Sequence, residues 1–131
     1  MISIFIVTYQ RRMANITKNF TEDELKCPCC SKVAMDSAYM ANLQEIRELC
    51  AFGFKVNSGY RCDSHNAKVS KNSKNDHTRG KAVDIHMTDR YKRTKLLIYL
   101  LNSGYFNDVA IAKTFIHIGK GRNKSGVGVY G

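Results

Sequence analysis

The sequence lacks any apolar run that approaches the roughly 18 residues needed to span a membrane. It also lacks internal repeats, low-complexity tracts and an evident linker, and Pro28 is its only proline. These absences exclude a membrane-spanning helix and a division into separate units. With 131 residues, 44% of them hydrophobic, the chain can bury a modest core, so we expect one compact domain over residues 1–131.

Acidic residues are scarce compared with basic ones. The chain has 11 Asp and Glu against 21 Lys and Arg, which gives a net charge of +10. This balance favours a polyanionic partner, such as nucleic acid, anionic lipid or an anionic cell-wall polymer. The basic residues are spread along the chain and form no helical stripe interleaved with aromatic residues, so we expect no specific nucleic-acid binding.

No targeting signal is visible at the N-terminus. In residues 1–12 the apolar part is short and the two arginines follow it, which is the wrong order for a secretory signal. Met13 is a plausible start, and residues 1–12 are then an upstream extension that we expect to lie outside the fold. The sequence therefore predicts synthesis in the cytoplasm without a signal peptide, with any export depending on other factors.

An odd number of cysteines, without a secretory signal, argues against a disulfide scaffold. Three of the five cluster early in the chain, and they could meet Cys62 and His65 in a structural zinc site. Because the spacing C-x-C-C is not a standard zinc knuckle, we favour reduced thiols, or a disulfide from Cys62 to Cys27 or Cys30, over a second metal site. The cysteines are Cys27, Cys29, Cys30, Cys50 and Cys62.

Apolar residues at three- and four-residue spacing predict amphipathic helices over residues 37–51 and 89–102, which Gly53 and Gly104 can end. A short helix is expected over residues 63–70. A capping box predicts a helical turn from about residue 21. Strands are predicted over residues 54–57, 82–86, 109–112 and 115–118. Since no regular alternation of strand and helix is present, we expect an α+β fold with a mainly antiparallel sheet packed with helices.

One segment combines metal-binding side chains with a turn. His77 precedes Asp84 by seven positions, and Gly80 permits a turn between them. His117 lies within an apolar stretch, residues 115–118. Two imidazoles and one carboxylate are a common ligand set of catalytic zinc, which keeps a further position open for water. The spacing alone leaves another interpretation open, because a histidine in an apolar strand is often a core residue.

Three motifs resemble those of the zinc D-alanyl-D-alanine carboxypeptidase family. They are Ser-Gly-Tyr-Arg at residues 58–61, His-Thr-Arg-Gly-Lys-Ala-Val-Asp-Ile at residues 77–85, and Phe-Ile-His-Ile at residues 115–118. That family includes phage endolysin peptidases and vancomycin-resistance dipeptidases, and the hedgehog signalling domain shares its fold. The similarity covers roughly residues 17–120. It implies a hedgehog/DD-peptidase-like fold and one catalytic zinc ion.

The resemblance also implies roles for individual residues. Arg61 matches the arginine that binds the substrate and stabilises the oxyanion, and Tyr60 lies beside it in the substrate-binding motif. Asn75 stands where the family usually has a serine, and an amide can still contact the substrate. The residues that match the metal ligands are His77, Asp84 and His117.

The general base departs from the family pattern. Relatives carry an acid three residues before the last histidine or two residues after it, and these positions are Thr114 and Gly119 here. Of the remaining acids, Asp108 is the nearest in sequence to the last histidine. His86 is the other candidate, because it lies two residues after the aspartate ligand and shares its strand face. His86 could instead be a fourth ligand or support one.

We therefore expect a monomeric zinc peptidase that cleaves stem or cross-link peptides of bacterial peptidoglycan, either as a carboxypeptidase or as an endolysin-type endopeptidase. The small size and the missing signal peptide suit a phage lysis protein that acts on the cell wall. The alternative is a non-catalytic, zinc-stabilised cell-wall-binding domain, for which the hedgehog domain is a precedent. A basic nucleic-acid-binding protein is a third candidate.

Overall fold

The computed structural model describes residues 14–70, 74–121 and 126–129. The predicted upstream extension, residues 1–12, lies outside the described residues. The helices are α2 (Glu22–Leu25), α3 (Ser37–Cys50), α4 (Asp63–Val69) and α5 (Arg90–Ser103). The strands are β1 (Asn15–Thr17), β2 (Phe20–Thr21), β3 (Lys55–Ser58), β4 (Ala82–His86), β5 (Asp108–Ile111), β6 (Phe115–Gly119) and β7 (Val127–Val129).

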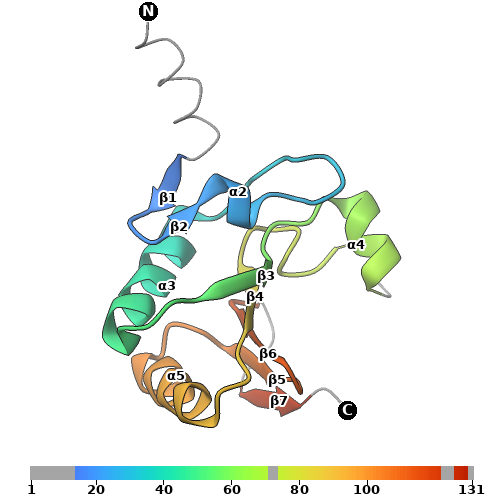
Figure 1. The fold of residues 1–131 in the computed structure, drawn as a ribbon. Coiled ribbons are helices and arrows are strands. Elements are labelled where there is room, and N and C mark those ends of the chain that lie inside the picture. The colour runs from blue at the N-terminus through green and yellow to red at the C-terminus, as the bar shows by residue number, and fades with distance from the viewer. Residues whose placement is uncertain (1–13, 71–73, 122–125, 130–131) are drawn as a thin grey trace, which may run out of the picture.

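Five strands form the main sheet, in the order β3-β4-β6-β5-β7 (Figure 1). All neighbours in it pair antiparallel except β5 and β7, which run parallel, and β1 and β2 form a small antiparallel sheet of their own. Helices α3 and α5 lie on one side of the main sheet, while α4 lies on the other side of the molecule (Figure 1). The predicted α+β fold with a mainly antiparallel sheet is confirmed.

The helix boundaries follow from local capping chemistry. The Asp36 carboxylate accepts a hydrogen bond from the backbone N–H of Tyr39 at 2.9 Å and begins α3. At the other end, Ala51 has a left-handed backbone with φ of 59° and donates its N–H to the carbonyl of Arg47. The expected end at Gly53 is therefore wrong, because the chain already turns at Ala51. Gly104, with φ of 69°, ends α5 as predicted.

Successive side chains along β4 and β6 point alternately towards the core and towards the other face of the sheet. Val83 and Ile85 on β4, with Ile116 and Ile118 on β6, are fully buried among the core residues of α3 and α5. Because successive side chains point to opposite faces, Asp84 and its neighbours in register face away from that core. The hydrophobic core thus fixes which side of the sheet carries the polar residues.

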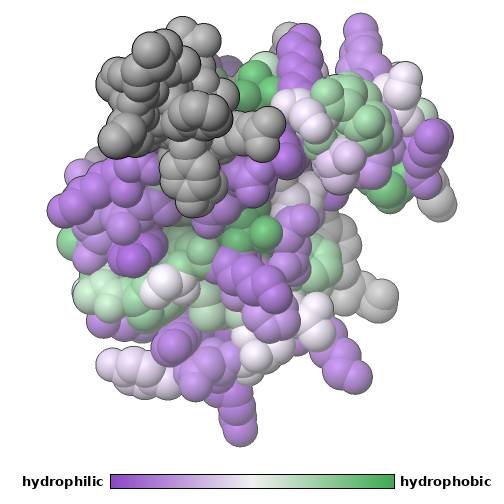
Figure 2. Space-filling model, turned by 45° about the horizontal axis from the view of Figure 1, so that its top comes forward, coloured by the Kyte–Doolittle hydropathy of each residue, from purple (hydrophilic) through white to green (hydrophobic). Residues whose placement is uncertain are grey.

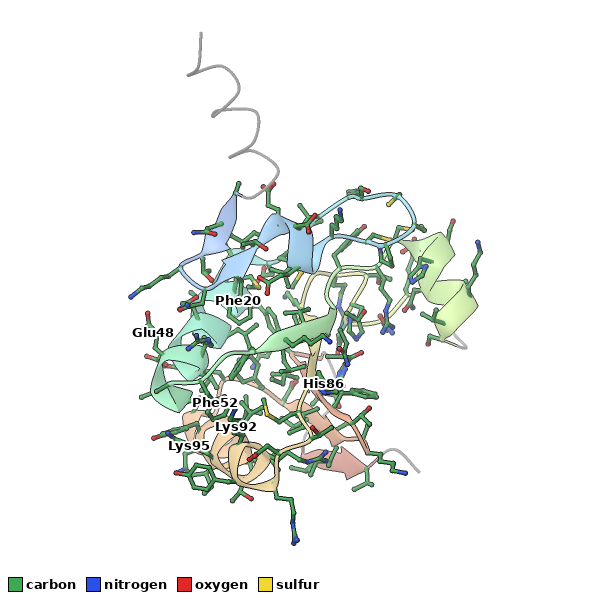
Figure 3. The ribbon with its side chains drawn as sticks, viewed as in Figure 1. Phe20, Glu48, Phe52, His86, Lys92 and Lys95 are labelled. Atoms are coloured by element: carbon green, nitrogen blue, oxygen red, sulfur yellow. The ribbon has the colours of Figure 1, made fainter. Side chains whose placement is uncertain are left out.

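Contacts between helices and sheet hold this arrangement. The Tyr39 hydroxyl of α3 donates a 2.6 Å hydrogen bond to the Ile118 carbonyl of β6. Near the ends of α3 and α5, Lys92 and Lys95 place their ammonium groups 5.5 and 6.0 Å from the ring centre of Phe52 (Figure 3). Hydrophilic residues cover most of the face drawn in Figure 2, with hydrophobic residues in separate areas. Among the described residues, no helix is long and apolar enough to cross a membrane.

Candidate active site

Strand pairing brings two of the predicted metal ligands directly opposite each other. Asp84 on β4 is in register with His117 on β6, and both side chains leave the sheet on the face away from the core. His117 Nδ1 lies 2.9 Å from Asp84 Oδ1. His77, in the loop before β4, places Nε2 3.6 Å from the same oxygen. One carboxylate oxygen is therefore the meeting point of two imidazole nitrogens.

The loop that carries His77 is held by its own hydrogen bonds. The Asn75 side-chain oxygen accepts from the backbone N–H of His77 at 2.9 Å. Gly80 has φ of 69°, and a Cβ at this position would collide with the carbonyl of Ala34, so only glycine fits the turn. His77 Nδ1 lies 2.8 Å from the Gly59 carbonyl. When Nδ1 carries the proton and donates it to that carbonyl, Nε2 is available to bind a metal ion or, in the metal-free protein, to take up a proton and donate it to Asp84.

Asp84 is buried and stays ionised. Burial alone would disfavour its charge, but the hydrogen bonds and charges of His117 and His77 outweigh that effect and hold the pKa of Asp84 well below its usual range. Its second oxygen, Oδ2, lies 3.2 Å from Arg61 Nη2. The carboxylate thus presents one oxygen to the two imidazoles and the other to a guanidinium.

Arg61 is fixed by three side-chain partners. Besides Asp84, its Nε donates to Ser58 Oγ at 2.9 Å and its Nη1 donates to the amide oxygen of Asn66 at 3.1 Å. Asn66 is fully buried at the second turn of α4. The only sign of Asn66 in the sequence was a polar residue in a short predicted helix directly after the Arg61 motif, which did not mark it as a site residue. The guanidinium is consequently held in one place before any substrate arrives.

The donor set suits a divalent metal ion. One ligand atom each from His77, Asp84 and His117 lies within 4.8 Å of the others, and all three residues are buried. Two neutral imidazole nitrogens and one carboxylate oxygen are a usual set of ligands for catalytic zinc. The predicted triad therefore converges, and its chemistry fits zinc.

A polar cavity of about 380 Å³ opens beside the triad. The predicted residues Arg61, Asn75 and Asp108 line it together with the three candidate ligands. Tyr60 and His86 are not among the described lining residues, since Tyr60 is buried at 8% exposure and His86 lies at the end of β4 (Figure 3). The full lining consists of Arg61, Val69, Ser70, Asn75, Asp76, His77, Asp84, Asp108, Phe115 and His117.

The two candidates for the general base differ in position. Asp108, the first residue of β5, lies with Oδ2 3.3 Å from His117 Nε2, on the ring edge opposite the nitrogen that faces Asp84. His86 pairs in register with Phe115 of β6 and Lys55 of β3. Only Asp108 shares the cavity with the triad, whereas the role of His86 stays a prediction.

Asp76 is a site residue that sequence analysis overlooked. It is 3% exposed, its Oδ1 forms an ion pair with Arg79, and its Oδ2 has no hydrogen-bond partner among the described residues. A Cβ at Gly119 would lie 3.2 Å from Asp76 Oδ2 and 2.9 Å from His117 Nε2. The carboxylate of Asp76 therefore borders the space that a side chain at position 119 would enter. Its place directly before the first ligand was the signal available in the sequence.

Four of the five cysteines also come together, outside the cavity. Cys27 and Cys29, in the loop after α2, approach Cys62 at the start of α4. Burial raises the pKa of Cys27, but hydrogen bonds from the backbone of Cys62 and Cys29 outweigh it and lower that pKa to about 6. The neighbouring thiols of Cys62 and Cys27 raise the pKa of Cys29 to about 12. Cys50 is separate, in the core face of α3.

The fold and the site together define the class of zinc-dependent metallopeptidases. The sequence matches the family model described as Peptidase M15 over residues 18–119, and the chain belongs to this family. The match confirms the resemblance seen in the three motifs and includes all three residues of the triad. A comparison with curated proteins found no match.

Proposed function

We propose that this metallopeptidase cleaves the stem or cross-link peptides of bacterial peptidoglycan. The observation that carries the proposal is the convergence of His77, Asp84 and His117 beside a polar cavity that also holds Arg61. Zinc bound by such a triad supplies Lewis-acid polarisation of a carbonyl group and a water of lowered pKa. A substrate peptide would lie in the cavity with its scissile carbonyl next to the triad.

Arg61 is suited to bind the substrate and stabilise negative charge. Three of its five N–H groups are engaged by Ser58, Asn66 and Asp84, which leaves donors that can face the cavity. A guanidinium that is already oriented can bind a terminal carboxylate or a developing oxyanion without reorganising. Asn75 lines the same cavity, and its amide nitrogen is suited to contact the peptide backbone.

Asp108 is the better candidate for proton transfer, because it lies in the cavity 3.3 Å from His117 Nε2. In that position it can orient the imidazole and accept a proton from a group bound in the cavity. His86 is the second candidate, and Tyr60 is proposed to act in substrate binding through the chain segment that it shares with Arg61.

The charge and size of the chain fit action on a cell wall. A net charge of +10 attracts the chain to an anionic wall polymer. We propose a monomer that is made in the cytoplasm and acts on the wall, as a phage-encoded lysis protein does. The products of cleavage would distinguish a carboxypeptidase, which releases a terminal residue, from an endopeptidase, which opens a cross-link.

A non-catalytic wall-binding domain is the alternative. It is favoured by one observation, the absence of an acid at Thr114 and at Gly119. Against it stand Asp76 and Asp108, two carboxylates that flank the ring of His117.

The test is release of soluble fragments from purified peptidoglycan of several chemical types, with zinc present and after chelation. We expect zinc-dependent release by the parent protein and none by a His77→Ala variant. If the zinc-loaded protein bound every type of peptidoglycan but released no fragments from any of them, the binding-domain alternative would be established. Mass analysis of the fragments identifies the bond that is cut.

A further inference from the structure

A second group of potential metal ligands lies apart from the triad. The sulfur atoms of four cysteines all lie within 4.8 Å of one another. Three of them belong to the loop between α2 and α3, which Figure 1 shows reaching across to the start of α4, where the fourth lies. The four are Cys27, Cys29, Cys30 and Cys62.

The separations of the sulfur atoms fit a tetrahedral ion. Tetrahedral zinc with Zn–S bonds of about 2.3 Å holds its sulfur ligands about 3.8 Å apart. Cys27 Sγ lies 3.6 Å from both Cys29 Sγ and Cys62 Sγ, and the last two lie 3.3 Å apart. These distances are far longer than the bond of about 2.05 Å in a disulfide. The separations among these three sulfur atoms are thus close to those between the sulfur ligands of tetrahedral zinc.

Backbone N–H groups support the sulfur atoms as anionic ligands. The N–H of Cys62 donates to Cys27 Sγ at 3.4 Å, and the N–H of His65 donates to Cys62 Sγ at 3.4 Å. Such hydrogen bonds favour the thiolate and orient it, as outer partners do in metal sites. His65 contributes its backbone here, and its imidazole is not required as a ligand, because the four cysteines already make up a complete set.

We propose that the four cysteines bind a second zinc ion with a structural role. Four thiolates form a closed ligand set, which is typical of structural rather than catalytic zinc. The sequence disfavoured this site because C-x-C-C is not a standard knuckle. The fold removes that objection, since Cys62 completes the set from a segment 35 residues distant from Cys27. A disulfide would use only two of the four thiols and leave Cys29 or Cys30 exposed beside it.

A metal ion would add a second anchor to the loop that carries three of these cysteines. Residues 26–36 contain no helix or strand, and within them Cys27 closes a turn by bonding Ser31 and Lys32 through its backbone. Cys29 and Cys30 are exposed and bury no apolar surface that could hold the loop. A zinc ion would tie this loop to the residue that follows Arg61. The cysteine site is therefore expected to hold the N-terminus of α4 and, with it, the backbone of Arg61.

Metal analysis of protein purified under reducing conditions tests the proposal. We expect about two zinc ions per chain in the parent and about one in Cys62→Ser and in Cys29→Ser. Serine can replace Cys62 as the N-cap of α4, so Cys62→Ser removes the ligand and keeps the cap. Cys29 is exposed, so Cys29→Ser disturbs no core packing. Cys50→Ala is the matched control, because it removes a thiol outside the group and should keep both ions.

Cobalt substitution identifies the ligands independently of activity. Parent protein loaded with cobalt should show thiolate-to-cobalt charge-transfer absorption. That absorption should persist in His117→Ala, which lacks the triad site, and vanish in Cys62→Ser. A His117→Ala variant that binds no zinc at all would overturn the proposal. The proposal would also be overturned if the mass of the parent chain were lower by two hydrogen atoms and peptide mapping placed a disulfide at Cys62. Iron instead of zinc at the four cysteines would reject zinc as the metal.

Discussion

Replacing Arg61 by alanine separates the chemistry of the site from its architecture. The change removes hydrogen bonds to Ser58, Asn66 and Asp84 but no metal ligand. Asn66 is fully buried, and its amide oxygen loses the hydrogen bond from Arg61 Nη1. Asp84 keeps both imidazole contacts, through the oxygen that does not face Arg61. We therefore expect Arg61→Ala to bind zinc at the triad as the parent does.

Two magnitudes follow from these contacts. Loss of the hydrogen bond from the charged guanidinium to the amide oxygen of Asn66 should lower the free energy of unfolding by about 1.5–3 kcal/mol. Loss of a preorganised donor to a developing oxyanion typically lowers the rate about 100-fold, which corresponds to roughly 2.7 kcal/mol in the activation free energy. The rate should be measured well below the unfolding temperature, so that the lower stability does not reduce the fraction of folded protein.

Arg93→Ala is the matched control. Arg93 also makes three hydrogen bonds, to the backbone carbonyls of Met87, Ala112 and Lys113, and it is not among the described residues that line the cavity. Its loss should lower stability but leave kcat/KM for a peptide that ends in D-Ala-D-Ala, or for purified peptidoglycan, near the parent value.

Two results would refute this reasoning about Arg61. Near-normal kcat/KM in Arg61→Ala at full zinc occupancy would show that the guanidinium does not act on the substrate. Loss of the triad zinc in the same variant would show that Arg61 supports the metal through Asp84 rather than the reaction.

Four further predictions concern single residues. His117→Ala should lose the triad zinc, as metal analysis would measure; unchanged zinc content would reject it as a ligand. Asp108→Asn and His86→Ala separate the two candidates for proton transfer. Substitution of the residue that transfers the proton should lower the rate about 100-fold or more at full zinc occupancy, and unchanged rates in both variants would reject both residues. Gly80→Ala should lower the free energy of unfolding by at least about 1 kcal/mol, because φ of 69° suits glycine; an unchanged Tm would contradict this. In protein freed of metal by chelation, the free energy of unfolding should fall as the pH drops from about 4 towards the depressed pKa of Asp84. The reason is that ionised Asp84 stabilises the folded state at any pH above the pKa that it has in the unfolded chain. Denaturant titrations of metal-free Asp84→Asn should show a shallower fall.

The sequence was informative wherever one local rule decided the structure. Periodic apolar residues predicted α3 and α5, and the strands predicted over residues 82–86 and 115–118 lie close to the observed bounds of β4 and β6. The candidate ligands His77, Asp84 and His117 were proposed because motif, spacing and chemistry agreed, and the structure brings the three side chains together. In contrast, β7 lies in a glycine-rich segment, and it pairs with β5 through backbone groups that leave little signal in the side chains.

Features that depend on tertiary contact could not be predicted. Asp76 belongs to the site because Gly119, which is distant in sequence, has no side chain to fill the space beside it. Asn66 matters only because the guanidinium of Arg61 reaches it. The cysteine group looked irregular in sequence because the spacing C-x-C-C is not a standard knuckle, and only the fold shows that Cys62 lies beside Cys27 and Cys29.

The pairing register between β4 and β6 makes formation of the triad depend on correct folding. Asp84 and His117 meet because they pair directly across the two strands, and both neighbours of His117, Ile116 and Ile118, are buried in the core. A slip by one residue would turn His117 into the core and an isoleucine into the cavity. A chain paired in the wrong register would then lack a complete triad, so zinc would stabilise only the correct pairing. Metal added during refolding should therefore raise the yield of correctly paired molecules.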